Sequence, residues 1–156
     1  MSTTGTTVDH DHDLMQTLES EVGLLIRRIK RVICVRAQQV HPELQSGAYS
    51  ILATLADVGP RRSSVIAETF HVDKGAVSRQ VQQLVDLGLA ERVPDPDDGR
   101  ASIIRVTDEG DRRLTAVSTR RRRILSERLG SWSETDLESF VRLLARYNET
   151  LDLTLD

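Results

Sequence analysis

Several features that mark common functional classes are missing from this sequence. It has one cysteine in 156 residues, so an intrachain disulfide is impossible. No apolar run approaches the ~18 residues that a membrane-spanning helix requires, and the first residues lack a secretory signal pattern. We find no Gly-rich phosphate loop, no nucleophile elbow and no constellation of catalytic side chains. The sequence therefore predicts one compact cytoplasmic unit that is neither a membrane protein nor an enzyme and that has no cofactor.

An excess of basic residues is missing as well. The formal net charge is −3, from 21 Lys and Arg against 24 Asp and Glu, which at first argues against a nucleic-acid partner. The charge is uneven, however: residues 61–128 hold 14 basic and 11 acidic side chains, whereas both flanking segments are net acidic. We therefore expect nucleic-acid contacts in the middle of the chain, with weak non-specific affinity and a dependence on specific contacts.

The most informative segment begins with a helix that starts after Asp73, a good N-cap residue. Apolar residues recur at helical spacing at Val77, Val81 and Leu84, and Gly88 supplies the left-handed position that ends a helix. The opposite face has small residues near its start and then Arg and Gln, which read guanine and adenine in the major groove. An ordinary solvated surface helix is the alternative. The candidate DNA contacts on this helix are Lys74, Ala76, Ser78, Arg79, Gln80 and Gln83.

A predicted hairpin follows this helix. Residues 89–93 and 101–106 have strand character, and the segment between them holds two prolines and a glycine, which is typical of a turn. Arg100 is expected at the tip, where it can enter the electronegative minor groove. Asp98 lies two residues earlier and can hold the guanidinium of Arg100 by a bidentate pair. The alternative is an acidic surface hairpin. A helix with a DNA-reading face and a following hairpin make a winged helix-turn-helix.

Two further helices are predicted before this segment. One spans residues 45–56 and ends at Gly59-Pro60, and a short one runs to Phe70 with Ser63 or Ser64 as its cap. Arg61 and Arg62 come directly before the short helix. With Ser63 and the free amides of the helix start, they are candidates for a clamp on DNA phosphate. A solvated pair of loop arginines is the alternative.

The stretch SRQVQQLVDLGLAERVPDPDDGRASIIRVTDEG resembles the MarR family of bacterial transcriptional regulators. The resemblance implies a homodimer that binds a pseudo-palindromic operator and is often released by a small ligand or an oxidant. It also implies that Arg100 is the minor-groove arginine and Asp98 its partner, with Ser78 and Arg79 on the recognition helix. Gly99 departs from the basic residue often found there, which puts one phosphate contact in doubt. The matching elements are Ser78-Arg79, Leu84…Gly88-Leu89, Arg92, Asp95-Pro96-x-Asp98-x-Arg100 and Val106-Thr107-x-x-Gly110.

The expected fold is mainly α with a small β-hairpin: a winged helix-turn-helix flanked by long helices. We expect a disordered tail over residues 1–13, an N-terminal dimerisation helix in 14–42, the DNA-binding lobe in 43–106 and C-terminal dimerisation helices in 107–156. The long helices carry broad apolar stripes that exceed what the small lobe covers, which favours an identical partner chain over a self-contained monomer. Adjacent His and Asp residues at 10–13 lie in the expected tail, so no metal site is predicted.

These patterns predict a repressor on an inverted-repeat operator that a small molecule releases. Arg36, His41, Tyr49 and Arg121 are candidates for the ligand cavity. A second hypothesis is a peroxide-sensing repressor using Cys34, which the nearby arginines would favour as a thiolate; the alternative is that Cys34 is a small core residue. A third hypothesis, of another class, is a winged domain that contacts proteins rather than DNA.

Overall fold

The computed structural model describes residues 5–98 and 100–152, so residues 1–4 of the expected tail and Gly99 lie outside the described residues. The chain is mainly helical with one small sheet. It divides into two compact units, the first running through Val117 and the second beginning at Ser118. Among the described residues, no helix is both long enough and apolar enough to cross a membrane.

The first unit begins with the long helix α1 (Gly5–Val40). This helix starts earlier than residue 14, where the sequence predicts its beginning, because no Pro or Gly stands between Gly5 and Gly23 to interrupt it. Near its end, Ala37 and Val40 are buried in the core of the unit. Before them Val22, Leu24 and Ile33 are half-buried. The other large apolar side chains are exposed on this chain: Leu14, Met15, Leu18, Leu25, Ile26, Ile29, Val32 and Val35.

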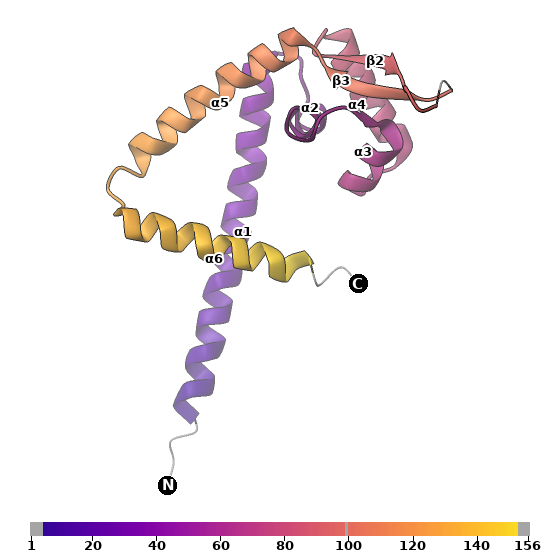
Figure 1. Cartoon of the computed structure of the whole chain (residues 1–156). Helices are drawn as coiled ribbons and strands as arrows, with labels where there is room; N and C mark the ends of the chain where they lie inside the picture. The colour runs from indigo at the N-terminus through magenta and orange to yellow at the C-terminus, as the bar shows by residue number, and fades with distance from the viewer. Residues whose placement is uncertain (1–4, 99, 153–156) are drawn as a thin grey trace. The chain divides into compact units, whose positions relative to one another are not determined.

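Three shorter helices build the core of the first unit: α2 (Ser46–Val58), α3 (Ser63–Phe70) and α4 (Lys74–Asp86). They lie together beside the hairpin (Figure 1). Their helical spacing of apolar residues is confirmed, because those residues fill one continuous core, and each large one contributes about 2 kcal/mol by burial. Helix α3 begins at Ser63 itself and its N-cap residue is Arg62, so a serine cap is wrong at this end. The buried side chains are Ala48, Ile51, Leu52, Leu55, Ile66, Ala67, Val77, Val81 and Leu84.

The sheet has three antiparallel strands rather than the two of a simple hairpin. Strands β2 (Ala90–Pro94) and β3 (Ser102–Val106) form the expected hairpin, and β1 (Arg61–Arg62) pairs with the other edge of β3. In this register Arg62 lies opposite Ile103. A strand of two residues gives no alternation to read, and therefore the sequence did not reveal it. Pairing with β3 ties the start of α3 to the hairpin.

Helix α5 (Asp108–Arg128) follows β3, and the boundary between the two units falls within it. The predicted cap at Thr107 is confirmed: its hydroxyl accepts from the Gly110 backbone nitrogen at 3.1 Å and donates to the Gly88 carbonyl at 2.7 Å. The bond to Gly88 also joins the start of α5 to the end of α4, since Gly88 is the turn that closes that helix.

The second unit contains the last part of α5 and the helix α6 (Glu134–Asp152). Ser133 caps α6 as predicted: its hydroxyl accepts from the Asp136 backbone nitrogen at 3.1 Å, and the Asp136 carboxylate accepts from the Ser133 backbone nitrogen at 3.3 Å. The rings of Trp132 and Phe140 meet edge to face with centroids 5.6 Å apart. The large apolar side chains of α6 are exposed on this chain: Leu137, Phe140, Val141, Leu143, Leu144 and Leu151.

Candidate nucleic-acid interface

Helix α4 is fixed at both ends and along one face. The Asp73 carboxylate accepts from the Ala76 backbone nitrogen at 2.9 Å, as expected of an N-cap. At the other end Gly88 has a φ of +69°, a conformation that favours glycine. Val77 and Val81 are completely buried, so α4 cannot turn about its axis without exposing them. The opposite face is therefore held outward, and the predicted contacts Lys74, Ser78 and Arg79 are exposed there.

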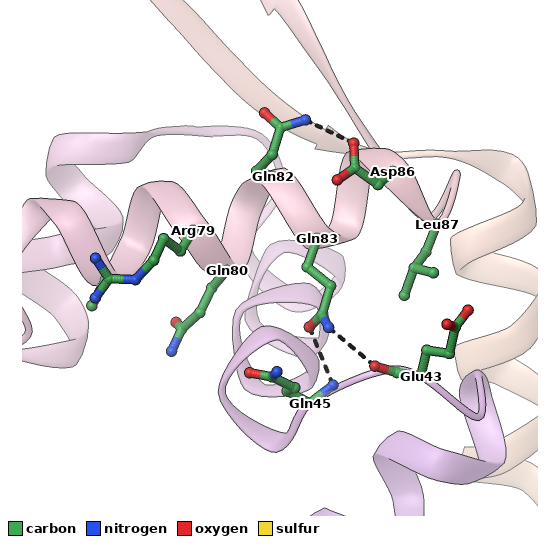
Figure 2. A pocket seen from close by; sticks show the side chains of 9 residues that line it. Glu43, Gln45, Arg79, Gln80, Gln82, Gln83, Asp86 and Leu87 are labelled. Atoms are coloured by element: carbon green, nitrogen blue, oxygen red, sulfur yellow. Dashed lines mark hydrogen bonds between the residues drawn. The ribbon is translucent and has the colours of Figure 1, made fainter.

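Gln83 does not point outward with them. Its amide lies against the segment His41–Gln45 that joins α1 to α2, here called the connector (Figure 2). The amide oxygen accepts from the Gln45 backbone nitrogen at 3.2 Å, and the amide nitrogen donates to the Glu43 carbonyl at 3.0 Å. The predicted reading of adenine by Gln83 is not what this geometry favours, because both ends of the amide are already engaged within the lobe.

Gln80 is also turned toward α2. It is half-buried, and a Cβ placed on Gly47 would lie 3.0 Å from the Gln80 Cδ, so the side chain rests on the first turn of α2. Ala76, one turn earlier, is half-buried too. Of the predicted outward residues, Lys74, Ser78 and Arg79 therefore form the exposed face, whereas Gln80 and Gln83 form the seam between α4 and the start of α2.

An open groove of about 870 Å³ runs along this seam. Gln82 donates to the Asp86 carboxylate at 2.8 Å on its rim, as Figure 2 shows. Among the described residues that line the groove, Arg79 is the one cation, so a phosphate or a base edge at this place would be met by Arg79. The groove is lined by Glu43, Gln45, Ala76, Arg79, Gln80, Gln82, Gln83, Asp86 and Leu87.

The wing ends in a tight turn that exposes Arg100. The Asp98 carboxylate accepts from the Arg100 backbone nitrogen at 3.1 Å, and the Asp98 carbonyl accepts from the Ala101 backbone nitrogen at 2.8 Å. The sequence predicted that Asp98 holds the guanidinium of Arg100. In the structure Asp98 instead fixes the backbone of Arg100, because a carboxylate two residues earlier reaches the amide of such a turn before it reaches the end of a long side chain.

Beneath the turn, the buried carboxylate of Asp95 connects the wing to β1. Its side chain accepts from the Arg62 Nε at 2.5 Å and from the Asp97 backbone nitrogen at 2.9 Å, and only 6% of the residue is exposed. The bond from Arg62 lowers the pKa of Asp95, and the Asp97 amide adds to this effect. The same pair raises the pKa of Arg62. Asp95 therefore stays ionised and holds the base of the wing in place.

This ion pair bears on the role predicted for the two arginines of β1. Arg62 was expected to clamp phosphate; its Nε donates to Asp95 and its side chain is 42% exposed, which leaves other donors for an anion. Arg61 is exposed, and its Nη1 donates to the Pro60 carbonyl at 2.8 Å, which leaves other donors for an anion. Ser63 is half-buried as the first residue of α3. A phosphate contact by Arg61 and Arg62 stays a prediction, with Arg62 also tying β1 to the base of the wing.

The candidate ligand residues lie in different surroundings. The His41 Nδ1 accepts from the Glu43 backbone nitrogen at 3.2 Å within the connector, and Tyr49 packs against the core. Arg36 is half-buried near the end of α1. Arg121 is exposed and belongs to the second unit. A cavity formed by these four residues stays a prediction.

Cys34 is exposed on α1, so the interpretation that it is a core residue of this chain is wrong. At 100° per residue Cys34 falls on the side of α1 opposite to the stripe of Leu18, Leu25 and Ile29. Its thiol is therefore accessible on the face that the apolar stripe does not use.

Comparison with known proteins shows which family has this sequence and this arrangement. Residues 43–101 match the family model described as the MarR family. The chain is also 32% identical to the uncharacterized HTH-type transcriptional regulator YxaD of Bacillus subtilis, over 86% of this chain and 93% of the relative. The chain belongs to the MarR family. Its other relatives include the HTH-type transcriptional repressor NicR of Pseudomonas putida, 27% identical over 81% of each chain.

Solved structures agree on the fold of this MarR-family regulator. The crystal structure of a MarR family transcription regulator covers 94% of this chain and 97% of its own with a TM-score of 0.78 at 20% identity. A MarR family protein from Bacillus stearothermophilus covers 88% and 97% with a TM-score of 0.71, also at 20% identity. The winged helix-turn-helix with long flanking helices is therefore confirmed as the fold.

The sequence missed two features of the site. Asp95 was named as part of the family-matching pattern but was given no role of its own, although Asp-Pro-x-Asp is a pattern in which the first carboxylate often bonds the backbone two residues on. The Arg62 partner had no such local sign, because it lies 33 residues away along the chain. The bonds of Gln83 to the connector had no local sign either, because Gln83 lies 38 residues from Gln45 and 40 residues from Glu43.

Proposed function

We propose that this MarR-family chain is a homodimeric repressor that binds an inverted-repeat DNA operator. The observation that carries the proposal is the pairing of an outward face on α4, with Ser78 and Arg79 exposed, and a wing that exposes Arg100. Arg79 suits a guanine in the major groove, and Arg100 suits the narrow minor groove beside it. The relative NicR, named as a transcriptional repressor, supports repression rather than activation.

The homodimer is supported by the apolar side chains that α1 and α6 leave exposed on a single chain. Such surface exceeds what a monomer normally presents to water, and a second copy is the simplest cover. In a two-fold dimer the recognition helices would enter successive major grooves ~34 Å apart. The operator should then be an inverted repeat with that centre-to-centre spacing.

Release by a small molecule is the regulatory part of the proposal. A ligand that favours the wrong spacing of the two lobes by a few kcal/mol is enough to empty the operator. The residues proposed for it are those predicted from the sequence, Arg36, His41, Tyr49 and Arg121.

The experiment is a gel shift of the purified protein on the DNA that flanks its own gene, at two salt concentrations and with scrambled competitor. We expect a specific complex that weakens as salt rises. Arg100→Ala should weaken operator binding about tenfold to a hundredfold, while the matched change Arg142→Ala in α6 should leave binding as in the wild type. Equal binding by Arg100→Ala would remove the wing from the interface. Failure of the wild type to bind this DNA or DNA selected from a random pool would favour the protein-contact hypothesis.

A second candidate for the signal is oxidation of Cys34, favoured by the exposure of its thiol on α1. Treatment with peroxide should then abolish the shift and a thiol reductant should restore it, and Cys34→Ser should be insensitive. Loss of binding in both proteins, or in neither, would exclude Cys34 as the sensor.

A further inference from the structure

The connector between α1 and α2 is held by several elements of the first unit at once. Leu44 is buried in the core, and its backbone nitrogen donates to the His41 carbonyl at 3.0 Å. Just before the connector, the carbonyl of Val40, the last residue of α1, accepts from the Arg113 Nη1 of α5 at 3.0 Å. Arg113 is itself fixed by Glu109 at 2.5 Å. The end of α1 and the start of α5 therefore meet at this place.

Helix α4 takes part in the same place through Gln83. Its amide bridges two backbone groups of the connector, the Gln45 nitrogen and the Glu43 carbonyl (Figure 2). The amide accepts with its oxygen and donates with its nitrogen, so it fits the connector in one orientation only. One turn earlier the Gln80 side chain rests on Gly47 and supports the same seam. A shift of the connector would therefore have to move α4 or break both bonds of Gln83.

We propose that Gln83 is a positioning residue that couples the direction of the recognition helix α4 to that of α1. In the proposed dimer, the packing of α1 would then set the direction of α4 on DNA. This inference rests on the proposed function, a dimer on an inverted repeat. In such a dimer the relative direction of the two α4 helices decides which half-site spacing fits. Gln83 thus acts on the spacing of the half-sites rather than on the identity of a base.

The test uses Gln83→Met, which keeps the length and helix propensity of the side chain but removes both hydrogen bonds. The matched control is Gln38→Met in the full chain. Gln38 is exposed on α1, so this variant makes the same side-chain change and keeps both bonds of Gln83.

The first measurement needs no DNA. Hydrogen exchange of the backbone amides should be about tenfold faster at residue 45 in Gln83→Met than in the wild type, with the amides of α3 unchanged. Gln38→Met should exchange like the wild type. Unchanged exchange at residue 45 in Gln83→Met would show that the bridge seen in the structure does not hold the connector in solution, and it would overturn the proposal.

The second measurement uses operators selected by the wild type from random DNA, then remade with one base pair added or removed between the half-sites. We expect the wild type and Gln38→Met to have a sharp optimum for the spacing of the half-sites. Gln83→Met should bind the optimal operator about tenfold more weakly, and its penalty for altered spacing should shrink, while base preference within the half-site stays the same.

Three results would overturn the inference. A changed preference for one base with the spacing optimum intact would make Gln83 a base-reading residue. An equal loss on every operator together with a lower thermal midpoint would make its role one of stability alone. An unchanged optimum and affinity would leave Gln83 without a role in binding. If the wild type selects no DNA, the proposed function itself fails, and the exchange experiment still decides whether the bridge exists.

Discussion

The DNA-binding lobe and the long helices differ in how far they bury their apolar side chains. In the lobe, Leu52, Leu84 and Ile104 are completely buried within the chain. In the long helices, Leu14 of α1 is 57% exposed and Val141 of α6 is 59% exposed. The lobe therefore has a core of its own, whereas α1 and α6 carry apolar surface that this chain alone does not cover. The contacts of the lobe thus lie within one chain, whereas the exposed faces of α1 and α6 are the surface that the proposed homodimer would cover.

The largest effect should come from a cavity in the lobe. Leu84→Ala should lower the free energy of unfolding by about 3 kcal/mol, because the removed side chain is completely buried and its space cannot refill. The same change at the exposed Leu143 of α6 should cost less than about 1 kcal/mol at low protein concentration. Chemical denaturation followed by circular dichroism measures both values.

Measuring both variants at several protein concentrations distinguishes a core within one chain from a surface covered by a second copy. The deficit of Leu84→Ala should be the same at every concentration, because its core lies within one chain. The deficit of Leu143→Ala should grow with concentration if a second copy covers α6. Equal deficits for both variants at low concentration would contradict the contrast between lobe and helices.

A charge on the exposed apolar face should act on assembly and leave the lobe intact. We expect Val141→Asp to raise the dimer dissociation constant by about two orders of magnitude, or roughly 3 kcal/mol, because the interface would bury an unpaired carboxylate. Thr135→Asp adds the same charge on the opposite side of α6 and should leave the dissociation constant unchanged. Sedimentation velocity measures both, and hydrogen exchange of the α4 amides checks the lobe. If both variants weakened the dimer equally, the cause would be the added net charge and not the burial of the apolar face of α6.

Local patterns predicted the parts of the molecule whose partners are near in sequence. The Asp73 cap, the turn at Gly88 and the Thr107 cap each depend on residues a few positions away or on a backbone preference, and the structure confirms them. The buried face of α4 follows from its helical period in the same way. Fold class and recognition helix could therefore be predicted before any tertiary contact was known.

The parts that sequence did not reveal depend on distant partners. Arg62 bonds to Asp95, and Gln83 bonds to the backbone of the connector. Either side chain would suit DNA equally well on an isolated helix or loop, so residue type alone predicted a DNA contact for both. Strand β1 was missed for the same reason, since it exists only through pairing with β3.

The smallest expected effect is on stability at low pH, and it should differ between the first and the second unit. Arg112 and Arg113 lower the pKa of Glu109 in the first unit from 4.5 to about 2, and Arg62 lowers the pKa of Asp95. A carboxylate with a lowered pKa stabilises the fold above its unfolded value, and this contribution is lost as the pH falls through the folded value. The first unit should therefore lose stability progressively between about pH 4.5 and pH 2.

Glu109→Gln isolates this contribution. The variant should unfold at a lower temperature than the wild type at pH 6, and the two thermal midpoints should converge as the pH approaches 2, because the wild type then loses the charge that the variant never had. Glu138→Gln makes the same change in the second unit and should give a curve that follows the wild type throughout. Thermal unfolding followed by circular dichroism at pH 6, 4 and 2 measures the three curves. A constant gap between Glu109→Gln and the wild type down to pH 2 would mean that Glu109 stabilises the start of α5 by packing rather than by its charge.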